Sequence, residues 1–183
     1  MTPIEALVKK NRDLAFKHAT DWLNFHAGFE NYLNYIRKEY HELAMHGIKG
    51  QGRAATFKTR VGAAVQSGKK IYSSGNIENL SRMEDEHAEA LVMKMALMDG
   101  CTDPMEYRAL ALVYGEMVKE TDEHSFPACN ICRQIIWENA NPETVIINVV
   151  PTGEIVFAAP LRLLYPFPYP NFSSIPRRLP NKC

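Results

Sequence analysis

Two short segments of the chain carry the residue types of a metal centre. One is the sequence His-Ala-Glu from His87 to Glu89, and the other is a Cys-x-x-Cys pair, Cys129 and Cys132. A catalytic zinc ion takes three nitrogen or sulfur ligands from the protein and keeps a fourth position for water. His87, Cys129 and Cys132 supply three such ligands. Glu89 can then move protons to and from a zinc-bound water or hydroxide without being a ligand. These residue types predict a catalytic zinc site.

The charge balance of this ligand set also suits zinc. Two thiolates and one neutral imidazole cancel the charge of the dication and leave a Lewis acid that can generate hydroxide near neutral pH. A helix N-terminus lowers the pKa of a thiol and so favours the thiolate that binds metal. We expect Cys129 and Cys132 to open one helix, and His87 and Glu89 to open another.

Each motif has a plainer interpretation when it is taken alone. A Cys-x-x-Cys pair is also typical of a redox site or of half a structural zinc site. The segment around His87 and Glu89 is acidic and is compatible with a solvated helix start. A structural zinc would need a fourth ligand, for which His124 is the nearest candidate, and we expect His124 in a loop. The two motifs together favour the zinc enzyme.

The elements that must position these residues follow from the pattern of apolar residues. Residues 3–46 have helical periodicity and predict one or two amphipathic helices, which the glycines from Gly47 to Gly52 are expected to end. A Pro-rich tail is expected from Pro160. The remaining pattern predicts strands at 61–65, 70–75, 107–114, 145–150 and 155–159, and helices at 85–98 and 129–137.

This order predicts an α/β protein with helices packed on a central sheet. The chain has 183 residues, 46% of them hydrophobic, which is enough for one well-packed domain. Within it we expect residues 1–50 to form a helical extension on the core and residues 51–183 to form the zinc-dependent domain.

Composition narrows the class of partner and the compartment. Lys plus Arg (21) equal Asp plus Glu (21), so the chain has no overall positive field for a polynucleotide, and we expect a small-molecule substrate and no nucleic acid. No stretch approaches the roughly 18 apolar residues of a membrane helix, and the N-terminus has no apolar signal region. Four cysteines are too few for a disulfide scaffold. A soluble, cytoplasmic protein is expected.

Residues from about 60 to 172 resemble the cytidine deaminase family, in its free-nucleoside branch. A His-x-Glu motif followed by Pro and Cys-x-x-Cys is typical of zinc-dependent nucleobase deaminases. Four segments are similar to family motifs in the same order: 61–65, 75–79, 129–134 and 163–167. The resemblance implies a three-layer α/β/α sandwich with a mixed, roughly five-stranded sheet, here with an extra N-terminal helical segment.

The resemblance also implies how the substrate is held. Asn76 and Glu78 are similar to the residues that bind the sugar hydroxyls, although a Gly-Asn sequence after a strand is by itself also typical of a turn. Further substrate contacts are implied for Ala88, Pro127 and Phe57.

Several positions depart from the family pattern. Many small members have Cys in place of His87 and Arg in place of Ala90, and these two differences are consistent because a site with one thiolate fewer needs no arginine to balance it. Thr59 stands where the family has an aromatic residue, so Phe57 is the nearest ring. Ala128 separates Pro127 from the first cysteine, and we expect the substrate preference to differ there.

The predicted reaction is the hydrolytic deamination of cytidine or deoxycytidine, or of a related cytosine nucleoside, to the uracil nucleoside and ammonia. Two alternatives stay open. One is a deaminase of a modified cytosine nucleoside such as a nucleoside antibiotic. The other is a catalytically inactive binding or assembly module of the same fold. By resemblance we also expect a homo-oligomer, either a dimer or a tetramer.

Overall fold

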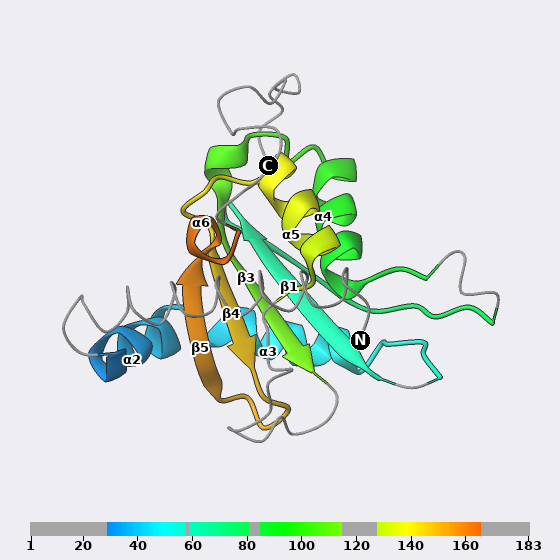
Figure 1. Ribbon diagram of the computed structural model, residues 1–183, viewed down its shortest axis with the longest axis horizontal. Coiled ribbons are helices and arrows are strands. Elements are labelled where there is room, and N and C mark those ends of the chain that lie inside the picture. The colour runs from blue at the N-terminus through cyan, green and yellow to red at the C-terminus, as the bar shows by residue number, and fades with distance from the viewer. Residues whose placement is uncertain (1–28, 58, 81–84, 115–127, 166–183) are drawn as a thin grey trace, which may run out of the picture.

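A computed structural model describes residues 29–57, 59–80, 85–114 and 128–165 of the chain. Figure 1 shows a central sheet with helices on both sides. The helices are α2 (Phe29–Glu39), α3 (His41–Gln51), α4 (Ala88–Met98), α5 (Asn130–Asn139) and α6 (Leu161–Leu164), with a 3-10 turn η1 (Pro104–Glu106). The strands are β1 (Val61–Ser67), β2 (Lys70–Gly75), β3 (Tyr107–Tyr114), β4 (Val145–Val149) and β5 (Ile155–Pro160).

The five strands form one mixed sheet in the order β2-β1-β3-β4-β5. Neighbouring strands are antiparallel except for β3 and β4, which are parallel. The parallel pair requires a crossover between its strands, and α5 lies in that connection. The mixed five-stranded sheet predicted for the chain is confirmed.

Side chains of β3 alternate between two hydrophobic cores, as the two-residue period of a strand requires. Leu110 and Leu112 are buried in the core beneath α4 and α5. Ala109, Ala111 and Val113 are buried in the core on the α2 and α3 side. Both faces of the sheet are therefore covered, and the predicted three-layer sandwich is confirmed (Figure 1).

The helical region ends within the predicted run of glycines, but only at its last one, since Gly52 is the C-cap of α3. The helix α3 continues through Gly47 and Gly50 to Gln51. A Cβ atom on Gly50 would lie 2.4 Å from the carbonyl oxygen of Ser74, and one on Gly47 would lie 3.0 Å from Val113 Cγ2. These glycines let α3 approach the sheet closely, a tertiary role that outweighs the helix propensity of glycine.

The predicted strands and the helices at α4 and α5 agree with the structure within a few residues. Of the helical region predicted at 3–46, the part from residue 29 onward forms α2 and α3, and residues 3–28 lie outside the described residues. The largest shift is at α4, which begins at Ala88 because Glu86 pairs with Ile77 as extended backbone. The tail predicted from Pro160 instead begins with the short helix α6. Among the helices of the described residues, none is long and apolar enough to cross a membrane. The division of the chain at residue 50 stays a prediction.

Candidate active site

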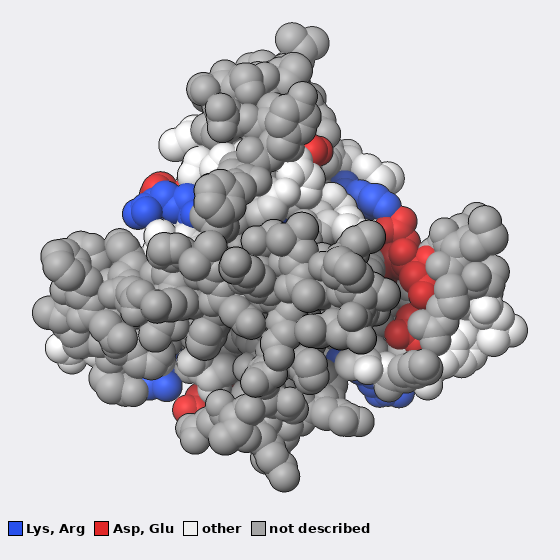
Figure 2. Space-filling view, in the orientation of Figure 1, with Lys and Arg blue, Asp and Glu red and all other residues white. Residues whose placement is uncertain are grey.

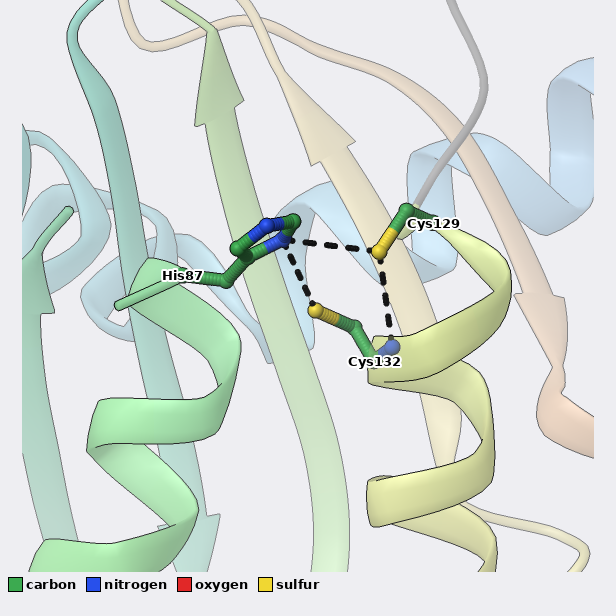
Figure 3. A group of neighbouring side chains, drawn as sticks. All are labelled: His87, Cys129 and Cys132. Atoms are coloured by element: carbon green, nitrogen blue, oxygen red, sulfur yellow. Dashed lines mark hydrogen bonds between the residues drawn. The ribbon is translucent and has the colours of Figure 1, made fainter. Parts of the chain in front are cut away.

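The N-termini of α4 and α5 lie next to each other and carry the predicted metal ligands. His87 is the N-cap residue of α4 in extended backbone geometry, and its side chain makes no capping hydrogen bond. Cys129 is the N-cap of α5, and its sulfur accepts from the backbone N–H of Cys132 at 3.4 Å. Figure 3 shows the imidazole reaching from one helix start toward both sulfur atoms at the other. The adjacent starts of α4 and α5 thus bring together His87 and Cys129, which are 42 positions apart in sequence.

The three ligand atoms are spaced as a zinc ion requires. His87 Nδ1 lies 3.4 Å from Cys129 Sγ and 3.3 Å from Cys132 Sγ. All three atoms lie within 4.8 Å of one another. Bonds of about 2.3 Å to sulfur and about 2.1 Å to nitrogen, at tetrahedral angles, put the nitrogen and a sulfur about 3.6 Å apart. Thiolate and imidazole ligands are those that select zinc, so the residues present fit this metal.

Without a metal, the three ligand side chains shift one another's pKa values. A hydrogen bond from Cys132 is the main reason that the pKa of Cys129 falls to about 4. Because Cys132 keeps its proton in that bond, the pKa of Cys132 is raised, and burial raises it further. The hydrogen bond to Cys129 raises the pKa of His87 to about 9, against the opposing effect of burial. At neutral pH the metal-free site therefore holds one thiolate, one thiol and one imidazolium.

Glu89 points inward from the first turn of α4 and is only 4% exposed. Burial is the main reason that its pKa is raised, and the negative charge of Cys129 adds to the effect. Three smaller effects lower the pKa of Glu89: a hydrogen bond to its own backbone, the nearby His87, and a hydrogen bond with Cys132. A carboxyl group with a raised pKa beside a metal site is suited to giving and taking protons near neutral pH.

Asn76 and Glu78 follow β2, and both make hydrogen bonds to the chain just before β1. The side chain of Asn76 accepts from the Val61 N–H at 2.9 Å and donates to the Thr59 carbonyl at 3.0 Å. A carboxylate oxygen of Glu78 accepts from the Phe57 N–H at 2.9 Å. These two side chains therefore hold the backbone at Phe57, Thr59 and Val61, and binding of the sugar hydroxyls by them stays a prediction.

Backbone pairing joins this segment to the metal site. Ile77 exchanges two hydrogen bonds with Glu86, at 2.9 and 2.8 Å, and Glu86 directly precedes His87. On its other side the segment pairs with Ala55, through bonds at 3.0 and 2.8 Å. We call residues 55–57, 59–61 and 76–78 the paired segment. Its pairing partner Glu86 directly precedes the candidate metal ligand His87, although no sequence motif indicates the pairing.

The remaining predicted substrate contacts lie in different environments. The Phe57 side chain is 62% exposed, whereas that of Ala88 is fully buried in the core beneath α4. Any contact that Ala88 makes with a substrate must therefore come from its backbone. Pro127 and His124 lie outside the described residues.

The C-terminal motif supports the helix that carries the cysteines. Arg133 Nη1 donates to the Leu164 carbonyl at 2.8 Å, and the Tyr165 hydroxyl donates to Gln134 Oε1 at 2.6 Å. The rings of Trp137 and Tyr165 meet edge to face with centroids 6.3 Å apart. Two motifs that are about 30 residues apart in the sequence thus form one packed unit.

Sequence reasoning missed Tyr114. Its hydroxyl, at the end of β3, accepts from the Ala128 N–H at 3.3 Å. Burial is the first cause of its raised pKa, and the negative charge of Glu89 is the second. An aromatic residue with a polar end at the last position of a buried strand was the available signal. Ala128 itself has φ of 61°, and no local feature of the sequence predicts this conformation.

Solved structures show the same arrangement of helices and strands. The cytidine deaminase from Burkholderia pseudomallei superposes on this chain with a TM-score of 0.62 and 23% identity. The match covers 71% of this chain and 98% of that enzyme. This chain has a cytidine deaminase-like fold. The cytidine deaminase from Mycobacterium tuberculosis matches 71% of this chain and 96% of its own, with a TM-score of 0.56 and 22% identity. The enzyme from Mycobacterium leprae matches 70% and 98%, with a TM-score of 0.54 and 20% identity. No protein-family profile and no curated protein sequence matches the chain.

Proposed function

We propose that this protein is a zinc-dependent hydrolase that converts cytidine, deoxycytidine or a related cytosine nucleoside into the uracil nucleoside and ammonia. The observation that carries the proposal is a buried carboxyl group, Glu89, next to a His-Cys-Cys cluster with zinc spacing. The cytidine deaminase-like fold supports the same chemistry by analogy. A redox pair would need neither the imidazole nor the buried carboxyl group.

The protein's own residues have separate tasks in this reaction. His87, Cys129 and Cys132 would hold the zinc, which supplies a Lewis acid that activates water near neutral pH. Glu89 takes a proton from the attacking water and gives it to N3 of the pyrimidine ring. It then carries a proton to the amino group that leaves C4. Because Glu89 is buried, bulk water does not compete for these proton transfers.

A small substrate is favoured over a polynucleotide. On the face shown in Figure 2, the Lys and Arg side chains of the described residues occur in separate groups, while Asp and Glu side chains gather at the right flank. Binding along a phosphate backbone relies on continuous positive charge. The paired segment supports a nucleoside, since Asn76 and Glu78 have the donor and acceptor groups that sugar hydroxyls need.

An ammonia-release assay of the purified, zinc-loaded protein tests the proposal. The panel contains cytidine, deoxycytidine, their monophosphates, cytosine, and cytosine nucleosides acylated or arylated at N4. We expect turnover of a nucleoside and, for Glu89→Gln, a rate at least about 10³-fold lower with folding and zinc content unchanged. No turnover of any compound by a zinc-loaded protein would favour the binding module. Wild-type rates in Glu89→Gln would remove the assigned chemistry.

A further inference from the structure

Ala128, directly before the candidate ligand Cys129, has a strained backbone conformation. Among the described residues, Ala128 is the one non-glycine residue with positive φ, at 61°. Residues with a Cβ atom disfavour this left-handed conformation, which glycine adopts freely. Ala128 is also 1% exposed and belongs to the core beneath α4 and α5. Strain of this kind persists where surrounding contacts impose it, and it is concentrated at functional sites.

Two fixed points impose the conformation of Ala128. On its C-terminal side, Cys129 is held as the N-cap of α5 by the bond between its sulfur and the Cys132 N–H. On its N-terminal side, the Ala128 N–H donates to the Tyr114 hydroxyl at 3.3 Å. The rigid peptide units leave φ and ψ of Ala128 as the soft backbone rotations at this residue between the two anchored groups. The two contacts together therefore restrict the range that φ can take.

The second anchor comes from a rigid part of the molecule. Tyr114 is the last residue of β3, the strand that pairs with both β1 and β4. Val113, its neighbour, is fully buried. A hydroxyl placed at the end of the central strand can therefore locate the chain that enters α5 relative to the sheet.

We propose that Tyr114 is a positioning residue for the metal site. Its hydroxyl holds Ala128 in the left-handed conformation, and this directs the Cys129 sulfur toward His87. Without that hydrogen bond, Ala128 relaxes toward negative φ and turns the start of α5. The inference rests on the proposed zinc site. Tyr114 makes no contact with the substrate in this role. Its hydrogen bond also lets an alanine occupy the position before Cys129, where the left-handed conformation otherwise favours glycine.

The test compares Tyr114→Phe, Ala128→Gly and the double variant. Each is titrated with zinc against a chelator of known affinity, and each is loaded with Co²⁺ to record its thiolate charge-transfer and ligand-field absorption bands. We expect Tyr114→Phe to bind zinc about tenfold more weakly, the lower end of the effect of losing a supporting contact, and to shift the Co²⁺ bands. In the double variant, glycine adopts the left-handed conformation unaided, so affinity and bands return toward wild type.

Tyr72→Phe is the matched control, because it also removes a hydrogen-bonded tyrosine hydroxyl. Tyr72 donates to Asp99 Oδ2 at 2.6 Å, and Asp99 lies at the opposite end of α4 from His87. This variant should leave the zinc affinity and the Co²⁺ bands unchanged. Wild-type affinity and bands in Tyr114→Phe would overturn the proposal, as would losses that glycine at position 128 does not reduce.

The outcomes also separate this inference from the proposed function. If the wild-type chain bound no zinc, the proposed function and the role of Tyr114 would both fail. If it bound zinc and Tyr114→Phe behaved identically, only the role of Tyr114 would fail. If Tyr114→Phe does not fold, the double variant decides between the outcomes. A double variant that folds and binds zinc with near wild-type affinity supports the proposal. A double variant that stays unfolded, while Ala128→Gly folds, overturns it.

Discussion

The metal site and the paired segment are held in place in opposite ways. At the metal site, the backbone is fixed by α4 and α5, whose inward residues are buried against the sheet. The side chains of His87 and Cys132 are therefore left for chemistry. In the paired segment, the side chains of Asn76 and Glu78 themselves hold the backbone at Phe57, Thr59 and Val61.

This difference predicts how each region responds to mutation. A metal ligand can be replaced without disturbing the fold, since packing rather than the ligand holds the helix. A residue of the paired segment carries two tasks, so its replacement should change stability and substrate binding together. The predictions below test that contrast, in order of decreasing expected effect.

Replacing Cys129 by serine should have the largest effect on the metal and a minimal effect on the fold. Serine is a preferred N-cap residue and can accept from the Cys132 N–H as the sulfur does. It does not supply a thiolate to zinc. We expect zinc affinity to fall by more than the roughly 100-fold that loss of a supporting contact costs. Competition titration measures the affinity.

The matched measurement for Cys129→Ser is the thermal unfolding of the metal-free protein. We expect its midpoint to lie slightly below that of metal-free wild type, because serine keeps the N-cap bond but loses the pairing of the Cys129 thiolate with the His87 imidazolium. A large drop in the midpoint would show that the thiol itself holds α5 in place, and the contrast between the two regions would then be wrong.

Zinc binding should depend steeply on pH. Between about pH 5 and pH 8, Cys129 is a thiolate because its pKa is lowered to about 4, and His87 is protonated because its pKa is raised to about 9. Cys132, with its pKa raised, keeps its proton. Zinc must displace the last two protons, so affinity falls by about 100-fold for each unit decrease in pH.

Calorimetry of zinc binding in buffers of different ionisation enthalpy counts these protons directly. Two protons released per zinc at pH 7 would support the assignment. A count near zero would mean that the metal-free site is already deprotonated, and the coupling between the three side chains would have to be abandoned.

Asn76→Ala should reduce stability and substrate binding at once. The change removes the acceptor of the Val61 N–H and the donor to the Thr59 carbonyl, where β1 begins. Loss of such partly buried partners costs about 1–3 kcal/mol. We expect the free energy of unfolding to fall by about this amount and the KM for cytidine to rise, measured by urea unfolding and steady-state kinetics.

Asn34→Ala is the control for Asn76→Ala. Asn34 is exposed on α2 and accepts a hydrogen bond from Arg37 at 3.1 Å. Its loss should change neither quantity. If Asn76→Ala raised the KM with full stability, Asn76 would act on the substrate alone, contrary to the hydrogen bonds it makes.

Local patterns were sufficient to predict most of the architecture and to indicate three candidate metal ligands, which the structure brings together at two helix starts. The strand at 107–114 shows as an apolar run, and the two ligand motifs each coincide with a helix start. Gly50 was misinterpreted because its reason is tertiary: a Cβ atom there would meet the Ser74 carbonyl on the sheet. Helix propensity is a local quantity and contains no information about that approach.

The unpredicted parts of the site are contacts between segments far apart in sequence. The bond from Ala128 to Tyr114 spans 14 positions and has no motif of its own. The pairing of Ile77 with Glu86 uses backbone groups, which every residue has. The residues of the candidate site are therefore easier to find in the sequence than the residues that hold them in place.

Glu78→Gln should produce the smallest effect and the sharpest separation of the two tasks of the paired segment. The glutamine oxygen still accepts from the Phe57 N–H, so the fold should be kept and the free energy of unfolding should fall by no more than about 1 kcal/mol. The negative charge is lost, and hydrogen bonds to charged groups exceed neutral ones by about 1 kcal/mol, so the KM for cytidine should rise about fivefold with kcat nearly constant. For 2′,3′-dideoxycytidine, which lacks the 2′- and 3′-hydroxyls, variant and wild type should have equal KM. Equal KM values for cytidine itself would leave Glu78 with its structural task alone, and the paired segment would then be a support for the metal site rather than a reader of the sugar.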